Sequence, residues 1–320
     1  MNKEHKIFFS NGVYDPASSR IKPFPQGVRL ETAGGFALHV PDKAVIEDMI
    51  HLVFSSADAA AHPGPFAVKI YAGVSTRLNI VVHKQGSGAF SPKEIKAEFF
   101  LSENACVDYY QFEEPGVRGA FSTENIFHLK KHSSLDYFVF AGSDGVSSSR
   151  TTVDFQEEHG FFSAKGISVL KESSKALHDL KVNHRVPHCI SRQYYKNILA
   201  GESRSEFVSL VHVAENASKS DSQQLNRNLL LSDGAAAYSK PELRIDTDDV
   251  IATHGSASGQ LEDDELFYLQ SRGFSRESAR LVLIDGFAGE MLSEVHEKDL
   301  RIYLDDAIRR RVRAVAGSAA

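Results

Sequence analysis

The chain has few of the residues that form disulfides or cysteine-based metal sites. Only two cysteines, Cys106 and Cys189, occur among its 320 residues, and tryptophan is absent. Two thiols cannot form a disulfide framework or a cysteine metal site. We therefore expect both to be structural thiols, buried in the fold.

Long apolar runs and an excess of basic residues are also missing. No stretch is long enough to cross a bilayer, and residues 1–12 lack an apolar core of signal-peptide length. The net charge of −6 leaves no basic excess to neutralise the phosphates of a nucleic acid. We therefore expect a cytoplasmic protein that binds neither membranes nor nucleic acids.

Motifs of two enzyme classes are absent as well. No phosphate-binding loop of the Gly-x-x-x-x-Gly-Lys-Ser/Thr type occurs, so the chain cannot hold a nucleotide in the way that P-loop ATPases do. The segment from Gly255 to Gly259 resembles a nucleophile elbow, but Ala257 occupies the position of the nucleophile. Neither activity is therefore expected of this chain.

A series of short strands fills the middle of the sequence. In residues 78–82 and 135–139 one face is consistently apolar, which is the period-two pattern of a strand packed on one side. Such a series is typical of a sandwich, a barrel or a coiled β-solenoid, and the pattern alone does not choose among them. The expected strands cover residues 67–71, 78–82, 95–101, 107–112, 135–140, 151–155, 166–170, 180–185 and 207–213.

Helices are expected on both sides of this series. Apolar residues recur at helical spacing over residues 42–54, after Pro41 in a start position. Near the C-terminus, a short helix over 263–272 ends at Gly273, and Ser275 can cap a second helix. A third helix is expected over 298–312, followed by a frayed tail.

The segment from Asp221 to Glu290 resembles the C-terminal part of the SufB/SufD family, the scaffold subunits of the SUF iron–sulfur cluster assembly system. The resemblance is dense from about residue 182 to residue 290 and thins towards the N-terminus, where only residues 9–13 match. It depends on several ordered blocks at family-like spacing: Gln-x-x-Asn-x-Asn-Leu-Leu-Leu-Ser (223–232), Lys-Pro-Glu-Leu (240–243), Asp-Asp-Val-x-x-x-His-Gly (248–255) and Leu-Phe-Tyr-Leu-x-Ser-Arg-Gly (266–273).

The resemblance implies a mainly β protein built around a right-handed parallel β-helix. Such a coil closes its backbone hydrogen bonds between stacked turns and needs covered ends. We expect a small mixed N-terminal region over residues 1–65, a β-helix core over 66–258 and a helical domain over 259–320.

His254 is the candidate metal ligand. Neutral imidazole binds iron or zinc well, although local sequence alone favours a structural role. The resemblance implies that this segment lies near the contact between two scaffold subunits, where the nascent cluster is built. The family cysteine two residues upstream is replaced by Ala252, which cannot supply a thiolate. We therefore expect no cluster bound stably by the chain alone, and only transient iron or a transient cluster at the subunit interface.

The resemblance also implies the partners. A missing cysteine makes the chain more similar to the SufD type than to the SufB type, so we expect a scaffold without catalytic activity. It should pair with a SufB-type subunit through the β-helix ends, or form a homodimer in isolation, and dock the SufC ATPase on its C-terminal helices. The candidate contact residues there are Glu265, Phe267, Tyr268, Arg272, Arg276 and Glu290.

An enzyme function remains the alternative. Asp248 and Asp249 form one carboxylate pair and Asp263 and Asp264 form another, which could act as acid and base in a carbohydrate-active β-helix. Structural roles at a strand end and at a helix start explain both pairs better.

Overall fold

Strands that follow one another in the chain alternate between two sheets, and three helices complete the protein. The computed structural model describes residues 4–55, 64–86, 88–89, 93–293 and 295–317. The first sheet contains β1 (Glu4–Ser10), β2 (Val13–Arg20), β5 (Met49–Ser55), β7 (Arg77–Gln85), β10 (Cys106–Glu113), β13 (Ser134–Ala141), β15 (Phe161–Leu170), β17 (Ile190–Leu199), β19 (Ser220–Leu230) and β21 (Val250–Gly259). The second contains β3 (Arg29–Glu31), β4 (Phe36–Val40), β6 (Phe66–Ala72), β9 (Glu94–Leu101), β12 (Ala120–Leu129), β14 (Val146–Phe155), β16 (Lys175–His184), β18 (Arg204–Val213) and β20 (Ala236–Ile245), and a small third sheet pairs β8 (Gly88–Ala89) with β11 (Val117–Arg118).

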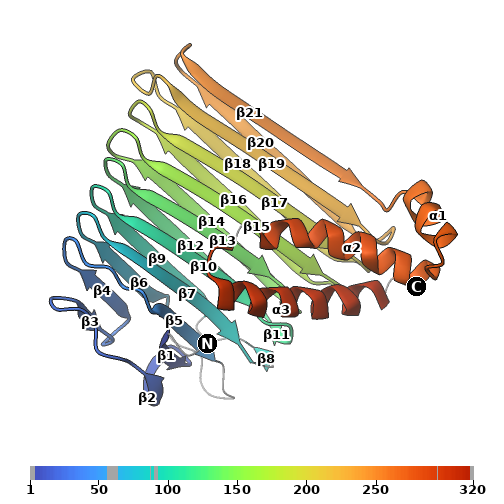
Figure 1. Ribbon diagram of the computed structural model, residues 1–320, viewed down its shortest axis with the longest axis horizontal. Helices are drawn as coiled ribbons and strands as arrows, with labels where there is room; N and C mark the ends of the chain where they lie inside the picture. Colours follow the sequence, from blue (N-terminus) through green and yellow to red (C-terminus); the bar gives the residue numbers. More distant parts are fainter. Residues whose placement is uncertain (1–3, 56–63, 87, 90–92, 294, 318–320) are drawn as a thin grey trace.

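The two large sheets are the opposite walls of a parallel β-solenoid of about seven turns (Figure 1). Each turn consists of one strand from each wall, and from β5 to β19 the wall strands pair in parallel with the strands one turn earlier and one turn later. The prediction of a parallel β-helix with C-terminal helices is confirmed.

Alternate residues of each strand point into the solenoid and form its core. In the N-terminal turns these residues are apolar or aromatic, and equivalent positions stack on one another. The ring of Tyr109 on β10 lies 5.2 Å from that of Tyr137 on β13, its register partner. In the C-terminal turns the inward residues become polar, as Gln193 on β17 and Gln224 on β19 illustrate. The core is therefore apolar at one end and polar at the other.

One corner of the solenoid repeats the same backbone conformation at nearly every turn. A residue with positive φ lies three positions before an inward-facing residue, and its amide group donates to a carbonyl of the next turn in several cases. Such a conformation tightens the turn but is uncommon for residues other than glycine. The corner residues are Lys43, Ser75, Asn104, His132, His159, His188 and Lys219. The rings of three of them, His132, His159 and His188, stack 4.8 Å apart.

The N-terminal segment extends the same walls. β1 and β2 form a hairpin whose two-residue turn, Asn11–Gly12, has positive φ at both positions, as such turns require. The prediction of a helix over residues 42–54 is wrong, because Met49–Ser55 is β5, paired with β1 and β7. Both faces of β5 are buried, so its apolar residues form a continuous run without a diagnostic period.

The C-terminal helices are α1 (Asp263–Ser271), α2 (Arg276–Leu292) and α3 (Lys298–Gly317). Helices α2 and α3 lie across the outer face of the first sheet, whereas α1 projects from the end of the solenoid (Figure 1). Ser275 caps α2 by accepting a hydrogen bond from the amide of Ser278, as predicted. α3 continues through residues 314–317, which were expected to fray, and residues 318–320 lie outside the described part. No helix within the described ranges is long and apolar enough to span a membrane.

Candidate functional site

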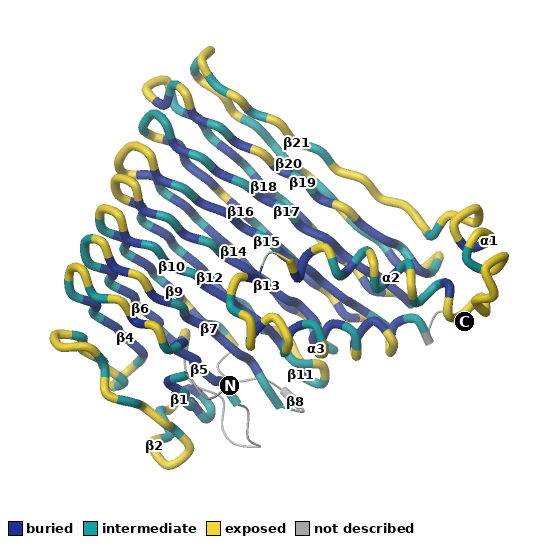
Figure 2. The backbone as a smooth tube through the Cα atoms, viewed as in Figure 1, coloured by how far each residue is buried: buried dark blue, intermediate teal, exposed yellow. Residues whose placement is uncertain are grey.

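The C-terminal end of the solenoid is open. β20 and β21 are the last strands of their walls, and among the residues that the structure describes each is hydrogen-bonded to a neighbouring strand on one side only. Figure 2 shows β21 largely exposed and β20 partly exposed, and neither strand contains a buried residue, in contrast with the strands of the preceding turns. Tyr238, Ile245 and Ile251 expose 54%, 40% and 65% of their surface here. Free strand edges beside exposed apolar side chains are a template for pairing with another chain.

The sequence of β20 fits its place at an edge. Pro241 lies in the middle of this strand, opposite Ser209 of β18. Proline has no amide hydrogen to donate, so it is tolerated in a strand whose other side has no neighbour within the chain.

The Gly/Ser-rich sequence around His254 is typical of a loop, but that interpretation is wrong, because His254 lies on strand β21 (Val250–Gly259). β21 pairs with β19 over its full length, which places His254 opposite Gln224 and Ala252 opposite Ser222. Gln224 and Ser222 are buried, inward-facing residues. His254 and Ala252 therefore belong to the inward-facing row, but both reach solvent because no further turn covers them. The small residues of this segment form a strand because their backbone continues the ladder.

The fold does not place Cys106 or Cys189 beside His254. Cys106 is the first residue of β10. Its register position on β21, five strands further along the sheet, is occupied by Ile251, and five strand spacings correspond to about 24 Å. Cys189 is buried in the core before β17, and burial raises the pKa of its thiol to about 11. Burial also raises the pKa of Cys106. Within the described ranges, no group of three or more His, Cys, Asp or Glu residues could hold a metal ion.

Helix α1 and the turn after it expose several aromatic side chains. Leu266 is the only buried residue of α1, whereas Phe267, Tyr268 and Phe274 are 72%, 57% and 43% exposed. The guanidinium of Arg272 lies 5.3 Å from the centre of the Tyr268 ring. These residues form an exposed aromatic surface, which we call the α1 surface, of the kind that dominates protein–protein contacts.

A groove of about 430 Å³ lies where the end of β21 meets helices α1 and α2. Its walls come from β19, β21, α1 and α2, and Glu265 and Phe287 are among the residues that line it. The groove thus joins the end of β21 to the first turn of α1, through Gly259 and Glu265.

Two of the candidate contact residues have partners within the chain. Arg276 lies 4.0 Å from Asp263. Glu290 on α2 accepts hydrogen bonds from Lys196 and from the hydroxyl of Tyr194, both on β17. The hydrogen bond from Lys196 is the main reason that the pKa of Glu290 is lowered. Glu290 therefore anchors α2 on the sheet, through a lysine that sequence patterns did not single out.

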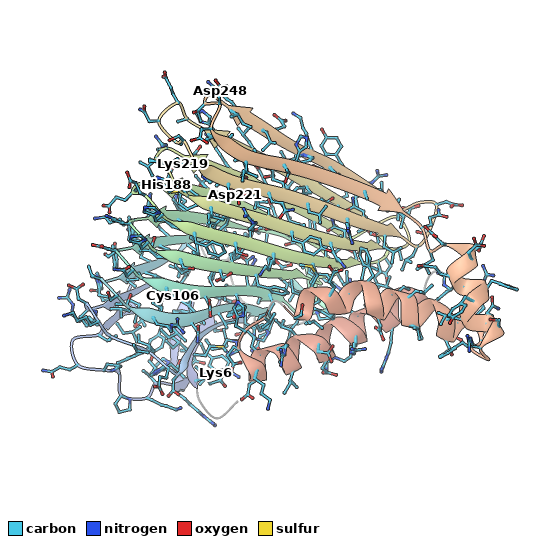
Figure 3. All side chains as sticks on the ribbon, turned by 45° about the horizontal axis from the view of Figure 1, so that its top comes forward. Lys6, Cys106, His188, Lys219, Asp221 and Asp248 are labelled. Carbon is cyan, nitrogen blue, oxygen red and sulfur yellow. The ribbon has the colours of Figure 1, made fainter. Side chains whose placement is uncertain are left out.

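The two aspartate pairs lie at opposite ends of β21. Asp248 and Asp249 occupy the corner before this strand, where Figure 3 labels Asp248, and Asp263 and Asp264 open α1 after it. Ten residues of extended strand span about 33 Å. The carboxylates of a glycosidase lie within about 10 Å of one another, so the two pairs do not form one site.

The class of protein follows from these features: a two-walled parallel β-solenoid with an open end and an exposed helical surface. Residues 58–287 match the family described as SUF system FeS cluster assembly, SufBD core domain. The chain therefore belongs to the SufBD family of iron–sulfur cluster assembly proteins.

Similar proteins carry the same description. An iron–sulfur cluster assembly SufBD family protein of Synechocystis is 30% identical over 297 residues, covering 83% of this chain and 62% of that protein. A SufBD family protein of Mycobacterium leprae is 38% identical over 245 residues, covering 72% and 60%. The iron–sulfur cluster assembly protein SufD of Escherichia coli is 37% identical over 120 residues, covering 38% and 28%. The chain thus spans about three fifths of the Synechocystis and M. leprae relatives.

Proposed function

We propose that this chain is a non-catalytic scaffold of the SufD type in cytoplasmic iron–sulfur cluster assembly. The open end of the solenoid is the observation that supports this proposal most strongly. An unpaired strand edge in each wall and the exposed side chains of Tyr238, Ile245 and Ile251 need a cover. A second solenoid of the SufB type would provide one by continuing both walls across the junction.

The α1 surface supports a second partner. A short helix with one buried residue is marginal in isolation, so α1 gains order when a partner covers Phe267 and Tyr268. A SufC-type ATPase is the partner that we propose for this surface. Because α1 follows β21 directly in the chain, movement of the ATPase would reach the junction between the two scaffolds.

His254 then has a defined role. It lies on β21, the last strand at the open end, where the partner solenoid would contact it. One imidazole cannot hold a cluster, so the partner would supply the thiolates, and iron or a cluster would be present only transiently. In isolation, the same end could pair with a second copy of this chain.

Copurification with SufB-type and SufC-type subunits tests the proposal. Ile251→Asp should abolish binding of the SufB-type subunit and spare the ATPase, whereas Phe267→Asp should do the opposite. Val146→Asp is the matched control, because Val146 is 42% exposed but lies away from both surfaces. If the unsubstituted chain recruits neither subunit, the proposed function is wrong.

A further inference from the structure

A line of four titratable side chains runs between the first sheet and helix α3. His51 Nδ1 lies 3.0 Å from Glu4 Oε2, and His51 Nε2 lies 3.1 Å from His83 Nδ1. His83 Nε2 lies 3.1 Å from Glu114 Oε1, which also accepts a hydrogen bond of 2.6 Å from the Tyr303 hydroxyl. The line therefore connects β1, β5, β7 and the residue after β10 with α3.

The two imidazoles at its centre are shielded from water. His51 and His83 are each 4% exposed, and the Phe112 ring lies 4.0 Å from the ring of His83. Each imidazole has both of its nitrogens in contact with another member of the line, so water cannot substitute for a missing partner.

Counting protons shows what the line lacks. Three contacts join Glu4, His51, His83 and Glu114, and each contact needs one proton to be a hydrogen bond. Two neutral imidazoles and two ionised carboxylates supply only two protons. If each imidazole donates to its carboxylate, Nε2 of His51 and Nδ1 of His83 face each other with lone pairs. One further proton would complete the line and change its charge from −2 to −1.

The burial of these side chains and their hydrogen bonds determine the pH at which that proton binds. Burial is the largest influence on both imidazoles and lowers their pKa values, that of His83 to about 4. The hydrogen bond from His83 is the largest influence on Glu114 and lowers its pKa. Burial raises the pKa of Glu4, but the hydrogen bond and charge of His51 outweigh it and the net shift is downward.

Some charged groups near these side chains disfavour protonation of the imidazoles, and others affect the ionisation of Glu114 and Tyr303. Lys6 on β1, labelled in Figure 3, disfavours a positive charge on either imidazole. Arg310 on α3 stabilises the ionised carboxylate of Glu114, and Asp306 on the same helix opposes ionisation of Tyr303. At neutral pH both carboxylates are therefore ionised and both imidazoles neutral.

We propose that the line Glu4–His51–His83–Glu114 is a single-proton switch between the solenoid and α3. On acidification one proton enters between the facing nitrogens and closes the third hydrogen bond. A second proton is excluded, since it would place the facing nitrogens of two imidazolium ions 3.1 Å apart in a buried site. In the neutral form with both imidazoles donating to their carboxylates, the two lone pairs repel, and the connection from β1 to α3 is interrupted at its centre.

Nitrogen-15 NMR of the imidazoles in the full chain tests this switch. From pH 7.5 downwards, the pair should show two protonated nitrogens at first and three in acid, with the amide spectrum of the fold retained. Four protonated nitrogens, two at every pH, or a bound metal ion between the rings would each overturn the proposal. Unfolding before the third proton binds would overturn it too.

Substitutions provide a second readout. His83→Gln should remove the acid step at His51, whereas His132→Gln should leave that step in place, because His132 is an exposed corner residue. If His51 titrates identically in the His83→Gln protein, the two imidazoles do not share a proton and the proposal fails.

Discussion

Arg311 on α3 donates a hydrogen bond of 2.5 Å to Asp144, at the corner before β14. The guanidinium is 2% exposed and also bonds the carbonyls of Val169 and Ser143, whereas the side chain of Asp144 is 19% exposed. This ion pair fixes the last helix to the middle of the solenoid. Because Arg311 is more deeply buried than Asp144, replacing either residue should lower the free energy of unfolding by a different amount.

Asp144→Asn should cost more stability than Arg311→Met. Loss of the carboxylate leaves a buried positive charge without a counterion, which costs about 3–5 kcal/mol. Loss of the arginine leaves a partly exposed carboxylate that water can reach. Urea denaturation of both variants measures the difference, and equal losses would show that burial of Arg311 does not control the energetics of the pair.

The protein should lose stability in mild acid because of its buried histidines. Burial lowers the pKa of His178 and of His184 to about 4, from about 6.5 in the unfolded chain. The unfolded state therefore binds more protons between these values, and stability falls as pH falls from about 6.5 towards 4. At pH 5 each residue should account for about 2 kcal/mol of the loss.

Melting temperatures at pH 7 and pH 5 measure this loss. The difference between the two should shrink in His178→Gln and stay unchanged in the control His132→Gln, whose imidazole is exposed. An undiminished difference in His178→Gln would mean that His178 is not a source of the acid sensitivity.

Restoring the family cysteine should change the chemistry of the open end. Ala252 and His254 lie on the same inward-facing row, about 7 Å apart along the strand. The unsubstituted chain should show no stable visible absorption after anaerobic reconstitution, because a lone imidazole provides too few ligands. Ala252→Cys should increase iron retention, with Ala257→Cys on the same strand as the control. A stable, stoichiometric cluster in the unsubstituted chain would contradict this prediction.

Arg272→Glu should weaken binding of the SufC-type ATPase by roughly tenfold and leave the melting temperature nearly unchanged. Arg272 is exposed, and its stacking on Tyr268 is worth only about 0.5–1 kcal/mol to the fold. Titration calorimetry measures the affinity, with Arg204→Glu on β18 as the control. A variant that is less stable but binds normally once folded would make Arg272 a structural residue.

Sequence patterns predicted most of the wall strands whose inward residues are apolar and missed several whose inward residues are polar. β10 and β13 alternate apolar and polar residues and were predicted. β19 was not among the expected strands, because its inward residues are Ser222, Gln224 and Asn226, which reverse the usual alternation. The αL corner residues recur once per turn, but they share a conformation and not a residue type, so no repeat was detected.

The candidate site was predicted in part. The sequence identified His254, the aromatic residues of α1 and the cap of α2, which depend on local motifs. It could not show that His254 faces inward at an open end, because that follows from the register of β21 on β19. The anchoring of Glu290 by Lys196 was likewise inaccessible, since it joins residues 94 positions apart in the chain.

The contacts of helices α2 and α3 also influence which turns of the solenoid unfold most easily. In a stack whose turns contact only their neighbours, unravelling can start at any turn and spread. Tyr303, Arg311 and Glu290 fasten α2 and α3 to residues from Glu114 to Lys196, and these contacts bind several turns into one cooperative block. β20 and β21 lie beyond these three fastenings. We therefore expect the open C-terminal end to fray more readily than this block, and a partner of the kind proposed above would close the stack at that end.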